Sequence, residues 1–199
     1  MGISGASGAV YGVRILEELA RLGVETDLVV SKAAALTIRH ELDRTVSDVA
    51  TLATRTHAIG DVGATLSSGS YRSDGMVVAP CSVKTLSAIV NSYDDNLLIR
   101  AADVALKERR PLVLLFRETP LHLGHLRLLT SAAELGARVF PPVPSFYHRP
   151  ETLADVVDQT VSRVLDQFGL DNGFSRWDGD TARRQPAQGA GSDSMRERA

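Results

Sequence analysis

The sequence contains a single cysteine, Cys81, which excludes an intrachain disulfide and a metal site built from several cysteines. It also lacks an excess of either charge: 22 basic and 24 acidic residues give no reason to expect nucleic acid or an anionic membrane as partner. No apolar run approaches the roughly 18 to 20 residues that cross a bilayer, and no signal-peptide pattern is present. We therefore expect a cytoplasmic protein in which Cys81 is a buried, inert thiol.

What is present is the apolar content of one globular domain, with 44% hydrophobic residues in a chain of 199. Short apolar runs alternate with segments of helical period, which predicts an α/β fold: a three-layer α/β/α, Rossmann-like arrangement around a central, mostly parallel sheet. Strands are expected at about Val24–Val30, Gly75–Ala79, Leu112–Phe116 and Ala137–Phe140. Helices are expected at Ser7–Leu22, Lys32–Glu41, Lys84–Asn91, Asn96–Glu108, Leu121–Leu135 and Leu153–Phe168.

The two ends of the chain differ in composition from this domain, which we expect to span residues 1–170. Residues 171–199 form a C-terminal extension, expected to be mostly disordered beyond Trp177 because almost no apolar residues follow. At the other end, only Met1 to Ser4 precede the first glycine-rich motif. The first strand is therefore expected to be very short, unless the natural chain starts further upstream.

The N-terminal motif GISGASGAVYG raises the question of a dinucleotide fingerprint. That fingerprint needs glycines at relative positions 1, 3 and 6 and an acidic residue after the second strand. Here Gly5 and Gly8 are three apart, and Ser31 and Lys32 follow the second strand, so NAD binding is disfavoured. The two glycines also suit simple close packing of strand and helix, but Ser7, at the expected helix N-terminus, favours a ligand.

Ligands of parallel α/β sheets bind where the carboxyl ends of the strands meet the loops that lead into helices. Segments rich in small, hydroxyl or charged residues are expected to reach that edge at four places: GASGA at 5–9, Ser31 and Lys32, PCSVKT at 80–85, and RETP at 117–120. The sequence therefore predicts one site built from these four loops.

Five separated motifs carry a family resemblance: GISGASGAVYG, VVSKAA, MVVAPCSVKTLSAI, NLLIRAADVALKERRPLVLLFRETPLHLGHL and PPVPSFYHRPETLADVVDQTVSRVLDQFG. Together, from Gly2 to about Gly169, they resemble the UbiX-type flavin prenyltransferases, which share the fold of the homo-oligomeric flavin-containing cysteine decarboxylases. The resemblance implies transfer of a dimethylallyl group from dimethylallyl phosphate to N5 and C6 of reduced FMN, without a metal. It further implies a dodecamer that delivers prenylated FMN to a UbiD-type decarboxylase.

At matching positions the resemblance implies three groups of site residues. FMN would be bound by Gly5, Ala6, Ser7, Ser31, Ser82, Val83, Lys84, Thr85 and Arg117. The phosphate of dimethylallyl phosphate would be bound by Arg100, Lys107, Tyr147 and Arg163. The polar residues closest to the chemistry would be Ser7, Glu41 and Glu118.

These residue types suit the cleavage of an allylic carbon–oxygen bond, which separates a carbocation from a phosphate. Lys107 and Arg163 supply positive charge, and Tyr147 a hydrogen bond, to the leaving phosphate. Glu118 can relay a proton to phosphate or to flavin N5, provided that burial keeps it protonated near neutral pH. Each also has an ordinary alternative, because charged residues on helices usually form solvated faces.

Two other functions stay open at this point. One is a flavin-dependent cysteine decarboxylase, weakened because PCSVKT stands where those enzymes carry a PASANT-like segment. The other is a non-catalytic FMN-binding subunit of an aromatic acid decarboxylase, which would not need a second phosphate site.

His122 and His125 lie three apart without an evident third ligand, so no metal site is expected. Monophosphate and pyrophosphate donors are not distinguished.

Overall fold

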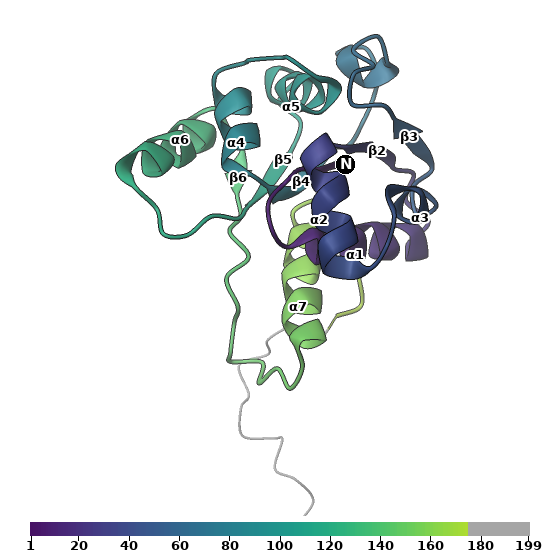
Figure 1. The fold of residues 1–199 in the computed structure, drawn as a ribbon, viewed down its shortest axis with the longest axis vertical. Helices are drawn as coiled ribbons and strands as arrows, with labels where there is room; N and C mark the ends of the chain where they lie inside the picture. The colour runs from purple at the N-terminus through teal and green to yellow at the C-terminus, as the bar shows by residue number, and fades with distance from the viewer. Residues whose placement is uncertain (175–199) are drawn as a thin grey trace, which may run out of the picture.

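A computed structural model describes residues 1–174, which form a six-stranded, entirely parallel sheet between two layers of helices (Figure 1). The strands are β1 (Gly2–Ile3), β2 (Asp27–Val30), β3 (Arg55–His57), β4 (Met76–Cys81), β5 (Leu112–Phe116) and β6 (Arg138–Val139). The helices are α1 (Ala9–Arg21), α2 (Lys32–Leu42), α3 (Val46–Ala50), α4 (Val83–Val90), α5 (Leu97–Lys107), α6 (Leu123–Glu134) and α7 (Leu153–Asp166), with a 3₁₀ turn η1 (Thr65–Ser67). The expected α/β/α fold is confirmed.

The strand order is β3-β2-β1-β4-β5-β6, so the chain runs outward in one direction from β1 and then outward in the other from β4. The point where the direction changes lies between β1 and β4. Loops that leave two such strands diverge to opposite faces of the sheet and open a crevice at their carboxyl ends. This order therefore places the segments that follow β1 and β4 at the natural ligand edge.

The helices divide between the two faces of the sheet. α4, α5 and α6 bury their apolar sides in one cluster, which includes Leu86, Leu98 and Ala132. On the other face, α1 packs against α7 through residues such as Ile15 and Val161, and against α2 in a neighbouring cluster. All side chains of β4 and β5 are buried, as expected for strands covered on both faces.

Several predicted boundaries need correction. The first helix begins at Ala9 rather than Ser7, because Gly8 adopts the left-handed conformation with φ of 103° and cannot belong to it. The second strand begins at Asp27 rather than Val24. β3 and α3 were absent from the prediction: β3 is a short edge strand with mostly exposed side chains, so it shows no apolar run.

Two further expectations, the buried thiol and the loop at 60–75, are confirmed. Cys81 is fully buried, and this desolvation raises the pKa of its thiol to about 12, as expected for an inert thiol. Residues 60–75 form the expected loop, apart from η1. No helix in residues 1–174 is both long and apolar enough to cross a membrane. The expectation for Trp177 and the chain beyond it falls outside the described residues.

Candidate functional site

The four loops predicted to share a site do lie side by side at the carboxyl edge of the sheet. Backbone hydrogen bonds connect them in turn. Ser31 N donates to Ile3 O at 3.0 Å, and Ser4 N donates to Pro80 O at 3.2 Å. Arg117 N donates to Cys81 O at 3.1 Å. The loops after β1, β2, β4 and β5 therefore form one continuous edge.

Ser4 joins two of these loops, and the sequence analysis missed its role. Its hydroxyl donates to Pro80 O at 2.9 Å and accepts from Ser82 N at 2.8 Å, and the residue is fully buried. Ser4 thereby fixes the start of the β4 loop against the end of β1. The available signal was a hydroxyl residue placed between an apolar strand and a glycine turn.

Replacing Ser4 by alanine should destabilise the protein by about 2 kcal/mol, because the Ser82 N–H loses its acceptor and Pro80 O keeps only the hydrogen bond from Ser4 N. For a chain of this size we expect the Tm to fall by roughly 4 to 8 °C. Thermal unfolding followed by circular dichroism measures this. Ser70→Ala, which removes an exposed serine hydroxyl, is the control and should shift the Tm by less than about 2 °C. Equal Tm values for the two variants would show that the hydrogen bonds of the Ser4 hydroxyl do not stabilise the fold.

Two serines of the predicted FMN group begin helices. Ser31 caps α2 by accepting from Ala34 N at 3.0 Å. Ser82 caps α4 by accepting from Thr85 N at 3.3 Å and also donates to the Thr85 hydroxyl. Helix N-termini attract anions because their first N–H groups point outward and the helix dipole is positive there. Both caps therefore place phosphate-compatible donors at the carboxyl edge.

The N-terminus of α1 already holds an anionic group from the protein itself. The Oε2 atom of Glu41, from α2, accepts from Gly8 N at 2.9 Å and from Ala9 N at 2.8 Å. Glu41 thus contacts the glycine loop, and its place near the chemistry stays a prediction. The Glu41 carboxylate already occupies these amides. A phosphate would therefore bind at the N-termini of α2 and α4 instead.

The glycine loop is held close to its neighbours on two sides. A side chain at Gly5 would meet the Cβ of Ala33 at 2.2 Å, so only glycine fits against the first turn of α2. Arg117, at the end of β5, donates through Nε to Ser7 O at 3.0 Å. The close packing expected of Gly5 is confirmed, and Ser7 and Arg117 are in contact. That they bind FMN stays a prediction.

Glu118 reaches the same edge but is exposed in the single chain, where its carboxylate accepts from Thr119 N at 2.9 Å. Its expected part as a proton relay requires burial. In the described chain no protein group covers it, so such burial has to come from a bound molecule or from another copy of the chain.

The residues predicted to bind the donor phosphate do not assemble within one chain. Arg100 and Lys107 lie on α5. Arg100 pairs with Asp94 at 3.0 Å and with Asp103 at 3.2 Å, while the exposed Lys107 pairs with its neighbour Glu108 at 2.6 Å. These two cations therefore belong to the helical layer formed by α4, α5 and α6.

Arg163 and Tyr147 lie elsewhere. Arg163 is on α7, in the opposite helical layer, and pairs with Asp166 at 3.0 Å. Tyr147 belongs to the irregular segment 140–152, which leads from β6 to the start of α7 (Figure 1). Lys107 and Arg163 therefore lie on helices that cover opposite faces of the sheet.

The histidine pair has a structural role. His122 caps α6 because its Nδ1 accepts from Gly124 N at 3.0 Å. Its ring stacks on that of His125, with the two ring centroids 3.6 Å apart. In residues 1–174 no group of three His, Cys, Asp or Glu side chains is arranged to hold a metal ion.

Comparisons with known proteins agree with this geometry. The Flavoprotein family model matches residues 1–165. A curated flavin prenyltransferase UbiX from Thauera aromatica is 63% identical over 184 residues, which are 92% of this chain and 95% of that protein.

Two solved structures extend the similarity to three dimensions. That of AnUbiX (PadA1) in complex with FMN and dimethylallyl pyrophosphate has a TM-score of 0.88 at 51% identity, covering 89% of this chain and 95% of that one. That of a dodecameric FMN-dependent UbiX-like decarboxylase from Escherichia coli O157:H7 has a TM-score of 0.86 at 48% identity, covering 88% and 97%. The chain therefore belongs to the Flavoprotein family and, within it, to the UbiX-type flavin prenyltransferases.

Proposed function

We propose that this protein joins the dimethylallyl group of dimethylallyl phosphate to N5 and C6 of reduced FMN and releases phosphate. The observation that carries the proposal is the carboxyl edge, where four loops bring hydroxyls, helix N-termini and Arg117 together at the switch between β1 and β4. The similarity to flavin prenyltransferases supports the same reaction. We assign it to residues 1–170 and place the protein in the cytoplasm.

The donor set at this edge fits a flavin mononucleotide. Ser31 and Ser82, at the starts of α2 and α4, suit its phosphate, with Lys84 adding positive charge in the first turn of α4. Ser7 and Arg117, in contact through the Ser7 carbonyl, would hold the flavin ring. When bound and reduced, FMN supplies the electron-rich ring that accepts the dimethylallyl group.

The chain's own side chains would manage the charges that develop. Lys107, Arg163 and Arg100 supply fixed positive charge to the departing phosphate, and Tyr147 donates a hydrogen bond to it. These protein cations make a metal unnecessary in the proposed reaction. Glu118 moves a proton to the phosphate or to flavin N5, and Glu41 positions the glycine loop through the amides of Gly8 and Ala9.

Because these cations lie on opposite faces of one sheet, we propose that several copies of the chain build each site, within a dodecamer. Large apolar side chains that are exposed in the single chain support an assembled state: Leu123 is 60% exposed, Phe146 73% and Leu153 78%. The product, prenylated FMN, would pass to a UbiD-type decarboxylase.

The activity is tested by mixing the purified protein with reduced FMN and dimethylallyl phosphate in the absence of oxygen. We expect a flavin product heavier by one C5 unit, detected by mass spectrometry, and release of one phosphate per product. A parallel reaction with dimethylallyl pyrophosphate identifies the preferred donor. Unchanged FMN with both esters intact would overturn the enzymatic function and leave a non-catalytic FMN-binding subunit as the explanation.

A further inference from the structure

The last residue of α5, Lys107, packs against a loop that precedes this helix in the chain. Residues 67–71 of the loop have the sequence SSGSY, and we call this segment the serine turn. A Cβ atom at Gly69, in its middle, would lie 2.6 Å from Lys107 Nζ and 2.2 Å from Glu108 Oε1. The ion pair between Lys107 and Glu108 therefore lies directly over the Cα atom of Gly69.

The backbone of the serine turn does not itself require glycine. Gly69 lies outside the left-handed region, unlike Gly75 in the same loop, which has a φ of 156°. The nearest atoms that a Cβ at position 69 would meet are the ends of two flexible side chains, Lys107 and Glu108. Alanine at position 69 is thus compatible with the backbone but not with the present place of the Lys107 ammonium. The missing side chain leaves room for this ion pair.

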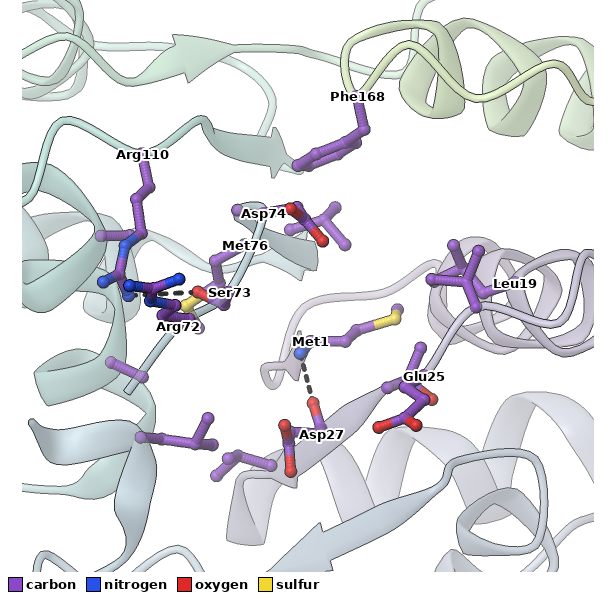
Figure 2. A pocket seen from close by; sticks show the side chains of 18 of the residues that line it. Met1, Leu19, Glu25, Asp27, Arg72, Ser73, Asp74, Met76, Arg110 and Phe168 are labelled. Carbon is purple, nitrogen blue, oxygen red and sulfur yellow. Dashed lines mark hydrogen bonds between the residues drawn. The ribbon is translucent and has the colours of Figure 1, made fainter. Parts of the chain in front are cut away.

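Arg110 ties the serine turn to the end of α5. Its guanidinium donates to Gly69 O at 2.8 Å, to Tyr71 O at 2.7 Å and to Ser73 Oγ at 3.3 Å. Figure 2 shows the contact with Ser73, where both residues line a cavity. A planar guanidinium offers several N–H donors in fixed directions, so one side chain holds three oxygens of the loop at once. The chain reaches Arg110 through Arg109, whose left-handed backbone, with a φ of 55°, closes α5 where glycine is the usual choice.

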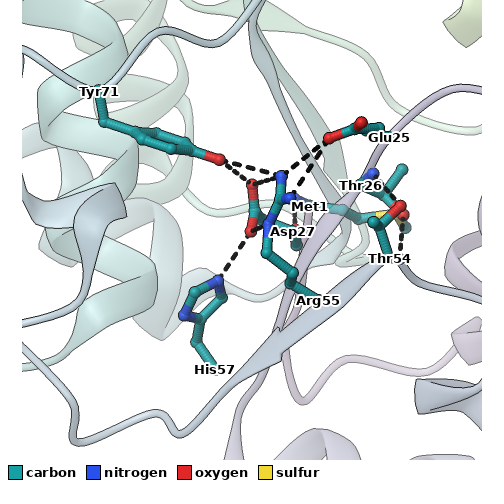
Figure 3. A network of polar contacts seen from close by, with 8 residues as sticks. All are labelled: Met1, Glu25, Thr26, Asp27, Thr54, Arg55, His57 and Tyr71. Atoms are coloured by element: carbon teal, nitrogen blue, oxygen red, sulfur yellow. Dashed lines mark hydrogen bonds and ion pairs between the residues drawn. The ribbon is translucent and has the colours of Figure 1, made fainter.

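Both ends of the serine turn are anchored as well. At its start, Ser67 O accepts from Arg100 Nε of α5 at 3.1 Å. At its end, Tyr71 OH donates at 2.8 Å to the carboxylate of Asp27 in β2, which also accepts from Arg55 Nε at 2.8 Å (Figure 3). The turn is thus fixed to α5 on one side and to the sheet on the other, so it forms a rigid support.

We propose that the serine turn positions Lys107 for the departing phosphate, with Gly69 and Arg110 as positioning residues. Fixing a long lysine side chain costs rotamer entropy. Contacts that fix it before the substrate binds remove that cost from the binding step. The phosphate then meets a positive charge that needs no reorganisation. This inference rests on the proposed function, in which Lys107 stabilises that phosphate.

The first test places a methyl group beside Lys107. Gly69→Ala should move Lys107 Nζ by about 1 Å, because the distance of 2.6 Å to the new Cβ has to grow to an ordinary contact of about 3.5 Å. We expect kcat/KM for dimethylallyl phosphate, measured as anaerobic phosphate release, to fall about 10- to 100-fold. The dissociation constant of FMN should stay unchanged. Gly60→Ala, in the same loop, places its Cβ in open space and is the matched control that should keep the parent values.

The second test asks whether Gly69 and Arg110 act through Lys107. Arg110→Gln should lower kcat/KM about tenfold and speed hydrogen exchange at the Tyr71 amide, which is hydrogen-bonded within the turn. Arg110→Lys keeps the charge but not the planar fork, so it should recover only part of the loss. Arg109→Gln controls for the loss of a nearby positive charge. In the Lys107→Gln background, Gly69→Ala should cause less than about a twofold further loss, because the charge that it displaces is gone.

A crystal structure of Gly69→Ala without FMN locates Lys107 Nζ independently of any turnover. An unmoved Nζ, or losses from Gly69→Ala and Lys107→Gln that multiply in the double variant, would overturn the positioning role. An equal loss of kcat/KM in Gly60→Ala would also overturn it, as a general effect of the loop. A parent protein that releases no phosphate would instead overturn the proposed function, and the place of Nζ in Gly69→Ala would still decide whether the serine turn fixes Lys107.

Discussion

Replacing Lys107 by glutamine should lower the rate of prenylated FMN formation by about 100- to 1,000-fold, because the leaving phosphate loses a fixed positive charge. The loss should be functional and not structural. Lys107 is exposed and pairs only with the neighbouring Glu108, and surface ion pairs of this kind contribute little to stability because water screens them. Phosphate release under anaerobic conditions gives the rate, and circular dichroism checks the fold. Arg109→Gln, which removes a positive charge two residues away, is the matched control and should keep the parent rate.

The same substitution tests how the site is shared. Lys107 and Arg163 lie on helices of opposite layers, so we expect each site to take them from different copies of the chain. Arg163→Gln alone should be as inactive as Lys107→Gln. When the two variants are unfolded together and reassembled in equal amounts, about one quarter of the sites regain both cations by random assembly. Activity near a quarter of the parent value supports shared sites, whereas no recovery would place both residues in a site within one chain.

The strands that are buried on both faces were predictable because nearly all of their residues are apolar. β5 was predicted at Leu112–Phe116, where the structure has it, since five apolar residues between turns leave little alternative for a strand buried on both faces. The helix predicted at Asn96–Glu108 differs from α5 only by its two capping residues. Both boundaries of α5, which capping residues mark, were thus predicted to within a residue.

Elements whose residues face solvent were harder to predict. β3 lies at the edge of the sheet, where Arg55 and Thr56 are exposed, so no alternation distinguishes it from a loop. The five-residue α3 did carry a usable signal, the capping box in which Thr45 and Asp48 satisfy each other's backbone N–H groups. Short elements of this kind depend on their neighbours for stability, and local sequence describes those neighbours poorly.

Only the part of the candidate site at the carboxyl edge of the sheet was predictable from the order of strands and loops. Residues at the carboxyl ends of adjacent parallel strands have to meet, so the topology alone brings Ser7, Ser82 and Arg117 to one edge. Family resemblance supplied Lys107, Tyr147 and Arg163 as site residues but carries no information on which copy of the chain each comes from. Glu118 illustrates the same limit, since its surroundings in an assembly are not encoded in the loop that carries it.

Replacing Glu118 by glutamine should slow the formation of prenylated FMN by about 100- to 10,000-fold, the range typical of a lost general acid or base. FMN should stay bound with the parent affinity, because the contact between Arg117 and Ser7 does not involve Glu118. Flavin retained on the purified variant, read from its absorbance, separates binding from turnover. The limb of the rate–pH profile that reports the ionisation of Glu118 should disappear in the variant.

The matched control for this substitution is Glu134→Gln, which removes an exposed carboxylate from the last turn of α6. It should leave rate and pH profile unchanged. A parent rate in Glu118→Gln would remove the proton relay from the mechanism, and lost FMN would make Glu118 a binding residue. The result also bears on assembly, because Glu118 is exposed in the single chain and a proton relay requires burial. Lost turnover with FMN still bound in Glu118→Gln would therefore support a site in which a bound molecule or a neighbouring copy of the chain covers Glu118.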